Sequence, residues 1–281
     1  MIQKTYHTDF MGNAFETALK EVMESDAYQK AAQVLLLVFE QNWDVDKIQE
    51  KMAHIQEMLP KAEVVGITHY EEEIWGLKLK NRSVLNFLFF ENPAFTMQRY
   101  DLHKNSEREV GEKMCQNFQK VQSLKGVMLL ISEYMMNMDD LISEAGKELR
   151  DIPVFGGTAL LNQEADKPIG YIFDKEGCYT QKAIAVLFHG ENLHMKVSYN
   201  YGWTPVGKKM KITKMDGDFR VLEIDKKPAM EIYNKYLGLQ TADTIQVPNI
   251  CEFPLVINRG GLIVARVPMY GDEEGAICFG A

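Results

Sequence analysis

Two short apolar runs separated by one amphipathic helix constrain the fold more than any other feature of the sequence. Gln33–Glu40 contains six consecutive apolar residues, and Val64–Ile67 forms a second run. Runs of this length are typical of strands that are covered on both faces. Between them, residues 44–59 carry apolar side chains at helical spacing and begin with Asp residues suited to capping. This order predicts two parallel strands joined by a right-handed helical crossover.

The same arrangement recurs later in the chain. Residues 107–121 have helical spacing, Val127–Ile131 forms a buried apolar run, and residues 139–149 predict a second helix. Pro153–Phe155 then predicts another buried strand, which leads into two glycines. The sequence therefore contains two βα units, with an alternating, strand-like stretch between them.

From residue 171 onward the pattern is typical of antiparallel sheets. Residues 183–188 and 193–199 predict a hairpin, and residues 209–214 and 219–224 predict another with Asp-Gly in its turn. A helix is expected over residues 228–237. The predicted fold is α/β: βα units with buried parallel strands are followed by antiparallel hairpins, in mixed sheets.

Charge and hydropathy exclude several classes of protein. The chain has 281 residues, and 31 Lys and Arg against 40 Asp and Glu give a net charge of −9. The basic residues form no stripe, so we expect no nucleic-acid partner, because binding a polyanion depends on clustered Lys and Arg. No apolar run approaches the roughly 18 residues of a membrane span, and the N-terminus has no apolar leader.

Cysteine and histidine spacing argues against a metal site. The four cysteines lie far apart with no CxxC pair, which indicates a reducing compartment and hence a cytoplasmic protein. His189 and His194 straddle a predicted turn, but no further ligands have the spacing that zinc requires. We expect no metal and no cofactor.

Two loops that follow buried strands are candidate binding sites, because ligands bind at the carboxyl ends of strands in open α/β sheets. In one, Gly156, Gly157 and Thr158 allow backbone N–H groups to approach an anion or amide; the alternative is that the glycines serve a tight turn or close packing. In the other, Thr68 and His69 precede several carboxylates; the alternative is a solvated acidic turn.

A third candidate is the aromatic segment 199–205, in which Trp203 either lines a small-molecule pocket or fills the junction between two sheets. The usual signatures of phosphate loops, nucleophile elbows and zinc hydrolases do not occur. Cys178 is a candidate nucleophile only with a base beside it, and an idle thiol is the alternative. We therefore expect a binding protein and no enzyme.

Four segments, in this order, resemble the FIST domain, a bacterial intracellular sensory module found with signalling output domains. Residues 64–70 are similar to the family's Gly-x-Thr strand end, and residues 154–159 to its Gly-Gly-x-Ala segment. The most specific similarity is in residues 202–213, and residues 221–238 resemble the Leu-Asp-Gly-x-Pro-Ala stretch. Glu72 and Lys227 depart from the pattern, since each stands where the family usually has glycine.

The resemblance implies a FIST N-terminal portion over residues 8–205 and the start of a C-terminal portion over residues 206–281, which we expect to be truncated. It implies a domain that senses a small polar metabolite, such as an amino acid, and regulates an output domain outside this chain. The alternatives are an enzyme that uses a Thr/His or Cys/His pair, and a protein-interaction scaffold. The candidate ligand-binding residues are Thr68, His69, Gly156, Gly157, Thr158 and Trp203.

Overall fold

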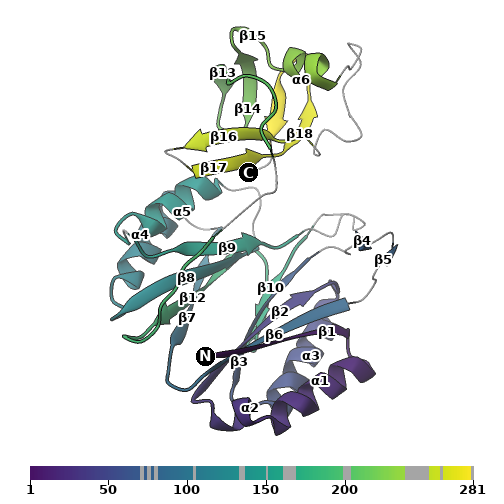
Figure 1. Ribbon diagram of the computed structural model, residues 1–281, viewed down its shortest axis with the longest axis vertical. Coiled ribbons are helices and arrows are strands. Elements are labelled where there is room, and N and C mark those ends of the chain that lie inside the picture. Colours follow the sequence, from purple (N-terminus) through teal and green to yellow (C-terminus); the bar gives the residue numbers. More distant parts are fainter. Residues whose placement is uncertain are drawn as a thin grey trace. The chain divides into compact units, whose positions relative to one another are not determined.

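A computed structural model of the protein describes residues 1–69, 73–74, 77–78, 82–103, 106–132, 137–149, 151–160, 169–198, 204–237, 253–259 and 262–279. The chain divides into an N-terminal unit, Met1–Val197, and a C-terminal unit, Ser198–Ala281. Figure 1 shows the helices and strands of both units.

The first sheet of the N-terminal unit is built around the predicted crossover. Its six described strands lie in the order β1-β6-β2-β3-β10-β11. Strands β2 and β3 run parallel and are joined by helix α3, which confirms the prediction, whereas the other described neighbours are antiparallel. The strands are β1 (Ile2–Asp9), β2 (Gln33–Glu40), β3 (Ala62–Thr68), β6 (Arg82–Phe90), β10 (Ile172–Asp174) and β11 (Gly177–Tyr179).

Three helices cover one face of this sheet: α1 (Asn13–Glu24), α2 (Asp26–Lys30) and α3 (Val45–Met58). The apolar face of α1, with Phe15 and Leu19, packs with Ile48 and Ile55 of α3 against the sheet. Asp44 caps α3 by accepting a hydrogen bond from the backbone N–H of Lys47. The helical spacing in residues 44–59 therefore marks the buried face of α3 correctly.

The second sheet has four described strands in the order β7-β12-β8-β9. Strands β8 and β9 are parallel, and β12 is antiparallel to both β7 and β8. Helices α4 (Glu107–Phe118) and α5 (Met138–Gly146) contribute to the apolar core on one face. The strands are β7 (Phe95–Asp101), β8 (Leu124–Ile131), β9 (Val154–Thr158) and β12 (Lys182–His189).

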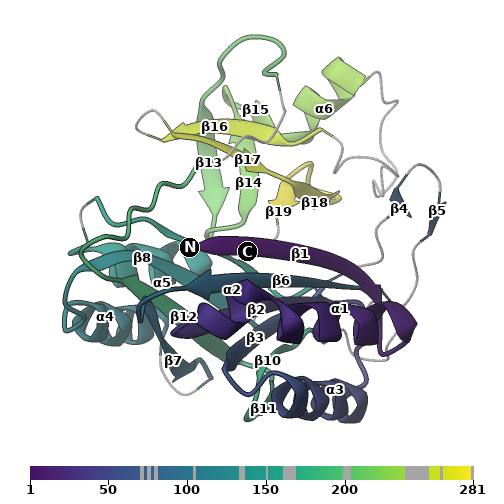
Figure 2. The ribbon, with the colours of Figure 1, turned by 60° about the horizontal axis from the view of Figure 1, so that its bottom comes forward.

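The two sheets pack face to face through a shared apolar core. Leu35, Val65 and Ile172 of the first sheet belong to the same cluster as Leu130 and Val186 of the second. The N-terminal unit is thus an α/β/β/α sandwich, with α1–α3 on one outer face and α4–α5 on the other (Figures 1 and 2). The mixed parallel and antiparallel sheets confirm the predicted α/β class.

The predicted hairpin of residues 183–188 and 193–199 is wrong. Strand β12 takes its partners from β7 and β8, and residues 193–198 form no strand. The reason is burial: Ala183 through Leu187 are fully buried, and such a strand needs neighbours on both edges to satisfy its backbone groups. Those neighbours come from distant parts of the chain.

The C-terminal unit contains the second predicted hairpin, which is confirmed by the antiparallel pair β13–β14. Its turn includes Gly217, whose φ of 62° lies in the left-handed region that favours glycine. Val221, Tyr233 and Ile277 belong to the small core of this unit. None of the described helices in either unit is long and apolar enough to cross a membrane.

The remaining elements are short. The C-terminal unit comprises β13 (Ile212–Asp216), β14 (Arg220–Ile224), β15 (Lys227–Pro228), α6 (Met230–Leu237), β16 (Leu255–Arg259), β17 (Leu262–Arg266), β18 (Pro268–Gly271) and β19 (Ile277–Phe279). In the N-terminal unit, β4 (Glu73–Ile74) pairs with β5 (Leu77–Lys78).

Candidate functional site

The ends of strands from both sheets meet at Thr68. Strand β3 ends at this residue, and the segment that follows β9 hydrogen-bonds to it through Leu160, whose N–H donates to the Thr68 carbonyl at 3.0 Å. The Thr68 N–H in turn donates to the Tyr171 carbonyl at 2.9 Å, just before β10. The structure therefore brings together two of the loops that the sequence marked as candidates.

The Thr68 side chain is buried and makes its contacts with backbone. Its Oγ1 lies 3.2 Å from the Leu160 carbonyl oxygen and 3.3 Å from that of Tyr171, and it accepts the Tyr171 N–H at 2.9 Å. With a relative exposure of 1%, this hydroxyl fastens three chain segments to one another.

His69 forms one wall of the surface next to this junction. Its backbone N–H donates to the Glu40 carbonyl at the end of β2, at 2.8 Å. Its half-buried ring meets the Phe39 ring edge-on, with centroids 6.5 Å apart. Phe39 is 37% exposed and Leu160 44% exposed, so apolar side chains reach solvent here.

Gly156 and Gly157 lie inside β9, paired with Leu129 and Leu130 of β8. The expectation that they follow a buried strand is wrong, because β9 is the half-exposed edge strand of the described sheet. Gly156 has φ 149°, and a Cβ there would lie 1.8 Å from the Leu129 carbonyl oxygen, so close packing excludes a side chain. Gly157 is exposed, and a Cβ there would meet nothing within 4 Å.

The remaining predicted residues contribute less to the described surface. Thr158 is half-buried and pairs with Ile131 in the β8–β9 ladder. Trp203 lies outside the described residues. We define the strand-end site as the surface of Phe39, Trp43, His69 and Leu160, together with Gly157, which lies three residues before Leu160 in the chain.

Phe39, Trp43 and Leu160 belong to this site but were not predicted from the sequence. The Trp43 indole N–H donates to the Leu160 carbonyl at 3.3 Å, the same carbonyl that the Thr68 hydroxyl contacts. For Trp43 a signal was present, because this residue lies in the short segment between the apolar run, which ends at Phe39, and the helix-capping Asp44. A half-buried aromatic residue at a strand end is typical of ligand sites.

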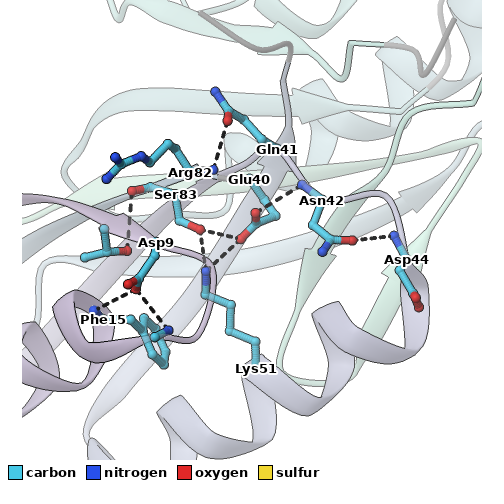
Figure 3. A network of polar contacts seen from close by, with 11 residues as sticks. Asp9, Phe15, Glu40, Gln41, Asn42, Asp44, Lys51, Arg82 and Ser83 are labelled. Atoms are coloured by element: carbon cyan, nitrogen blue, oxygen red, sulfur yellow. Dashed lines mark hydrogen bonds and ion pairs between the residues drawn. The ribbon is translucent and has the colours of Figure 1, made fainter. Parts of the chain in front are cut away.

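A buried polar network lies at the end of β2 (Figure 3). Lys51 Nζ of α3 donates to Glu40 Oε2 at 2.7 Å and to Ser83 Oγ at 2.5 Å, and the Ser83 hydroxyl donates to the same Glu40 oxygen at 2.8 Å. Next to it, Gln41 Oε1 accepts the Arg82 N–H at 2.9 Å. The network joins β2, β6 and α3.

The electrostatics of Lys51 reflect its burial. Burial lowers the pKa of Lys51, and the Glu40 carboxylate opposes this by favouring the charged form. The Phe10 and Phe15 ring centroids lie 4.6 and 4.9 Å from Nζ, so aromatic faces supply part of the lost solvation. Lys51 could be noticed in the sequence, since it lies three residues after Ile48 on the apolar face of its helix.

A groove lies between α3 and the β10–β11 turn, which Figure 2 shows next to each other. This groove has a volume of about 590 Å³ and is lined by residues such as Met52, Gln56 and Glu176. Its Asp174 pairs with Arg99 at 2.5 Å. None of the residues predicted to bind a ligand lines it, so its size alone does not make it the better candidate.

The geometry does not favour nucleophilic catalysis at the residues that the sequence raised for it. Burial, with a smaller contribution from Asp174, raises the pKa of Cys178 to about 12. A thiol with such a pKa carries almost no thiolate at neutral pH, and the thiolate is the nucleophile. The Thr68 hydroxyl is hydrogen-bonded to backbone, which cannot act as its general base.

The family model for the FIST N domain matches residues 34–227. This chain belongs to the FIST family. FIST domains are sensory domains of signalling proteins, and the family is not a family of enzymes. A search among curated proteins finds no match. The FIST match begins within β2 and includes every residue of the strand-end site, whereas β1, α1 and α2 precede it.

Proposed function

We propose that this protein is a sensory domain that binds a small, polar, amino-acid-like metabolite at the strand-end site and regulates an attached output domain. The observation that carries the proposal is the junction of β3 and β9 at Leu160, next to the exposed backbone of Gly157. At Gly157 the space that a side chain would occupy is open, because a Cβ there would meet no atom within 4 Å. Strand ends of α/β proteins are the usual place for ligands.

The chemistry of the site suits a zwitterion with a small apolar part. Strand β9, at the edge of the described sheet, offers backbone N–H and C=O groups on its side away from β8, while Phe39, Leu160 and the His69 ring offer apolar and aromatic surface. The nearby charges of Glu40 and Lys51 are fully buried and paired, so they do not select for net charge. A ligand with one ammonium and one carboxylate group has no net charge and therefore matches a site that does not select for one.

Binding at a junction of two sheets provides a route to regulation. A ligand that contacts both the β3 end and the segment after β9 favours the conformation in which the two are close, and this differential affinity shifts the population. We also propose a cytoplasmic location, because Cys115, Cys178 and Cys278 are free thiols. Gly156 and Thr158 hold β9 in place at the junction.

The test is a thermal-shift screen with the twenty amino acids and related small acids and amines. A ligand at 100 times its dissociation constant stabilises the native state by about 2.7 kcal/mol, which raises the Tm by a few degrees. We expect Gly157→Val to abolish that shift, because the added side chain occupies the open space without a clash.

Gly146→Ala is the matched control, since its Cβ would meet Val154 at an ordinary 3.8 Å and lies outside the site. It should leave the ligand-induced shift unchanged. A ligand that stabilises the wild type and Gly157→Val equally would place binding elsewhere. A screen without any hit would contradict the proposed ligand class.

A further inference from the structure

We propose that Glu40, with Lys51 as its buried counter-ion, is a positioning residue that holds Trp43 at the strand-end site. The consequence of this positioning role for ligand binding rests on the proposed function. The positional role itself rests on contacts that exist without a ligand, so the two ideas can fail separately.

A gain in folding stability does not explain why the Glu40–Lys51 ion pair is fully buried. The side chains of Glu40 and Lys51 are both 0% exposed, with 2.7 Å between Nζ and Oε2. Removing two charges from water costs about as much as their attraction returns, so apolar replacements of buried ion pairs are often neutral or stabilising. A pair of this kind at the end of a strand is better explained by what its hydrogen bonds hold in place.

Glu40 contacts both loops of the site. Its Oε1 accepts the Asn42 N–H at 3.1 Å, in the turn between β2 and α3. Its main-chain carbonyl accepts the His69 N–H at 2.8 Å, at the end of β3. Asn42 Oδ1 then accepts the Asp44 N–H at 2.8 Å, and Asp44 caps the helix that carries Lys51. Turn, helix and carboxylate form a closed ring of contacts (Figure 3).

Trp43 lies in the chain between Asn42 and Asp44, which are both part of this ring of contacts. Because Asn42 and Asp44 on either side are fixed, the indole is presented to the Leu160 carbonyl, which its N–H reaches at 3.3 Å. Glu40 thereby sets the distance between the β2–α3 turn and the segment that follows β9. The Glu40 side chain is fully buried, so its effect on the exposed surface is exerted through Trp43.

The test compares two double variants that share one change. Glu40→Leu with Lys51→Met removes the charges and the acceptor for Asn42, whereas Glu40→Gln with Lys51→Met keeps an amide oxygen at that place. The readout is hydrogen exchange of the Trp43 indole N–H, assigned by NMR with Trp43→Phe. We expect exchange to rise about tenfold in the Leu variant, the loss of one hydrogen bond, and to return toward wild type in the Gln variant.

Equal exchange in the two folded variants would overturn the proposal, because the acceptor at position 40 would then not matter. If the Leu variant does not fold, the wild type still decides. Its Asn42 amide and Trp43 indole protons must exchange as slowly as amides of the buried strands, and loop-like exchange would overturn the proposal. For any ligand found in the screen, we expect weaker binding, about tenfold or more, in the Leu variant alone.

Discussion

The Thr68 hydroxyl contacts the backbone of the two segments that follow β9 and precede β10. Thr68→Val, which keeps the shape, should lower the free energy of unfolding by about 1–3 kcal/mol, because buried backbone groups lose their partner. Urea denaturation measures this, and Thr68→Ser should retain most of the stability. Equal stability of Thr68→Val and the wild type would contradict the fastening role. Binding lost in Thr68→Val must be separated from this loss of stability.

The thiol of Cys178 is a weak acid, because burial raises its pKa to about 12. A thiol with the ordinary pKa of 9.0 would carry about a thousand times more thiolate at pH 8, because each pKa unit is a factor of ten. We expect iodoacetamide to modify Cys178 more slowly than half-buried Cys278, with a rate that keeps rising above pH 10. Mass spectrometry of the labelled peptides measures both rates. Fast labelling of Cys178 at pH 8 would revive the Cys/His alternative.

At the scale of elements, β9 contains two adjacent glycines with opposite requirements. Gly156→Ala should lower the free energy of unfolding by about 2 kcal/mol or more, because φ 149° and the Leu129 carbonyl exclude a Cβ. Gly157→Ala should be neutral or stabilising, since its Cβ meets no atom within 4 Å. Chemical denaturation of the two variants measures the difference. Similar losses at both positions would show that β9 is not held as described.

Elements that depend on local spacing could be predicted, and those that depend on distant partners could not. Strand β2, helix α3 and strand β3 are each marked by their own apolar period, and their parallel pairing follows from the helix between them. The partners of β12 are not local, so a hairpin with the following residues was the wrong expectation.

The candidate site shows the same division. The sequence marked the Thr68 loop and the Gly156–Thr158 segment as candidates, because ligands bind at the carboxyl ends of strands in α/β sheets, but it did not show that the two lie in different sheets and meet through Leu160. The role of Glu40 was not predictable, because Ser83 and Lys51 reach it from other elements. Nor does a sequence reveal that Gly156 serves packing while its neighbour leaves space.

At the scale of the whole molecule, each unit has its own apolar core. Three clusters lie within residues 1–197, and a fourth lies within the C-terminal unit. The FIST match runs from residue 34 to residue 227, so it neither starts nor ends with a unit. The family match and the N-terminal unit therefore have different boundaries in this chain, and the strand-end site lies within both.

Because the N-terminal unit begins before the family match, we expect two truncated fragments to behave differently. A fragment of residues 1–197 should fold on its own, because it retains both sheets of the sandwich and the helices on their outer faces. A fragment of residues 34–197 should not, although it begins where the family match begins. It lacks β1, which covers the edge of β6, and it lacks α1, whose Phe15 and Leu19 are fully buried.

Each buried side chain of that size contributes about 1.5–3 kcal/mol, so losing α1 removes much of a typical domain's net stability. The loss also exposes Lys51, since Phe15 of α1 and Phe10 before it lie against its ammonium group. Circular dichroism and thermal unfolding of both fragments measure the outcome. Cooperative unfolding of the 34–197 fragment near the Tm of the longer one would mean that the matched region is complete without its N-terminal strand and helices.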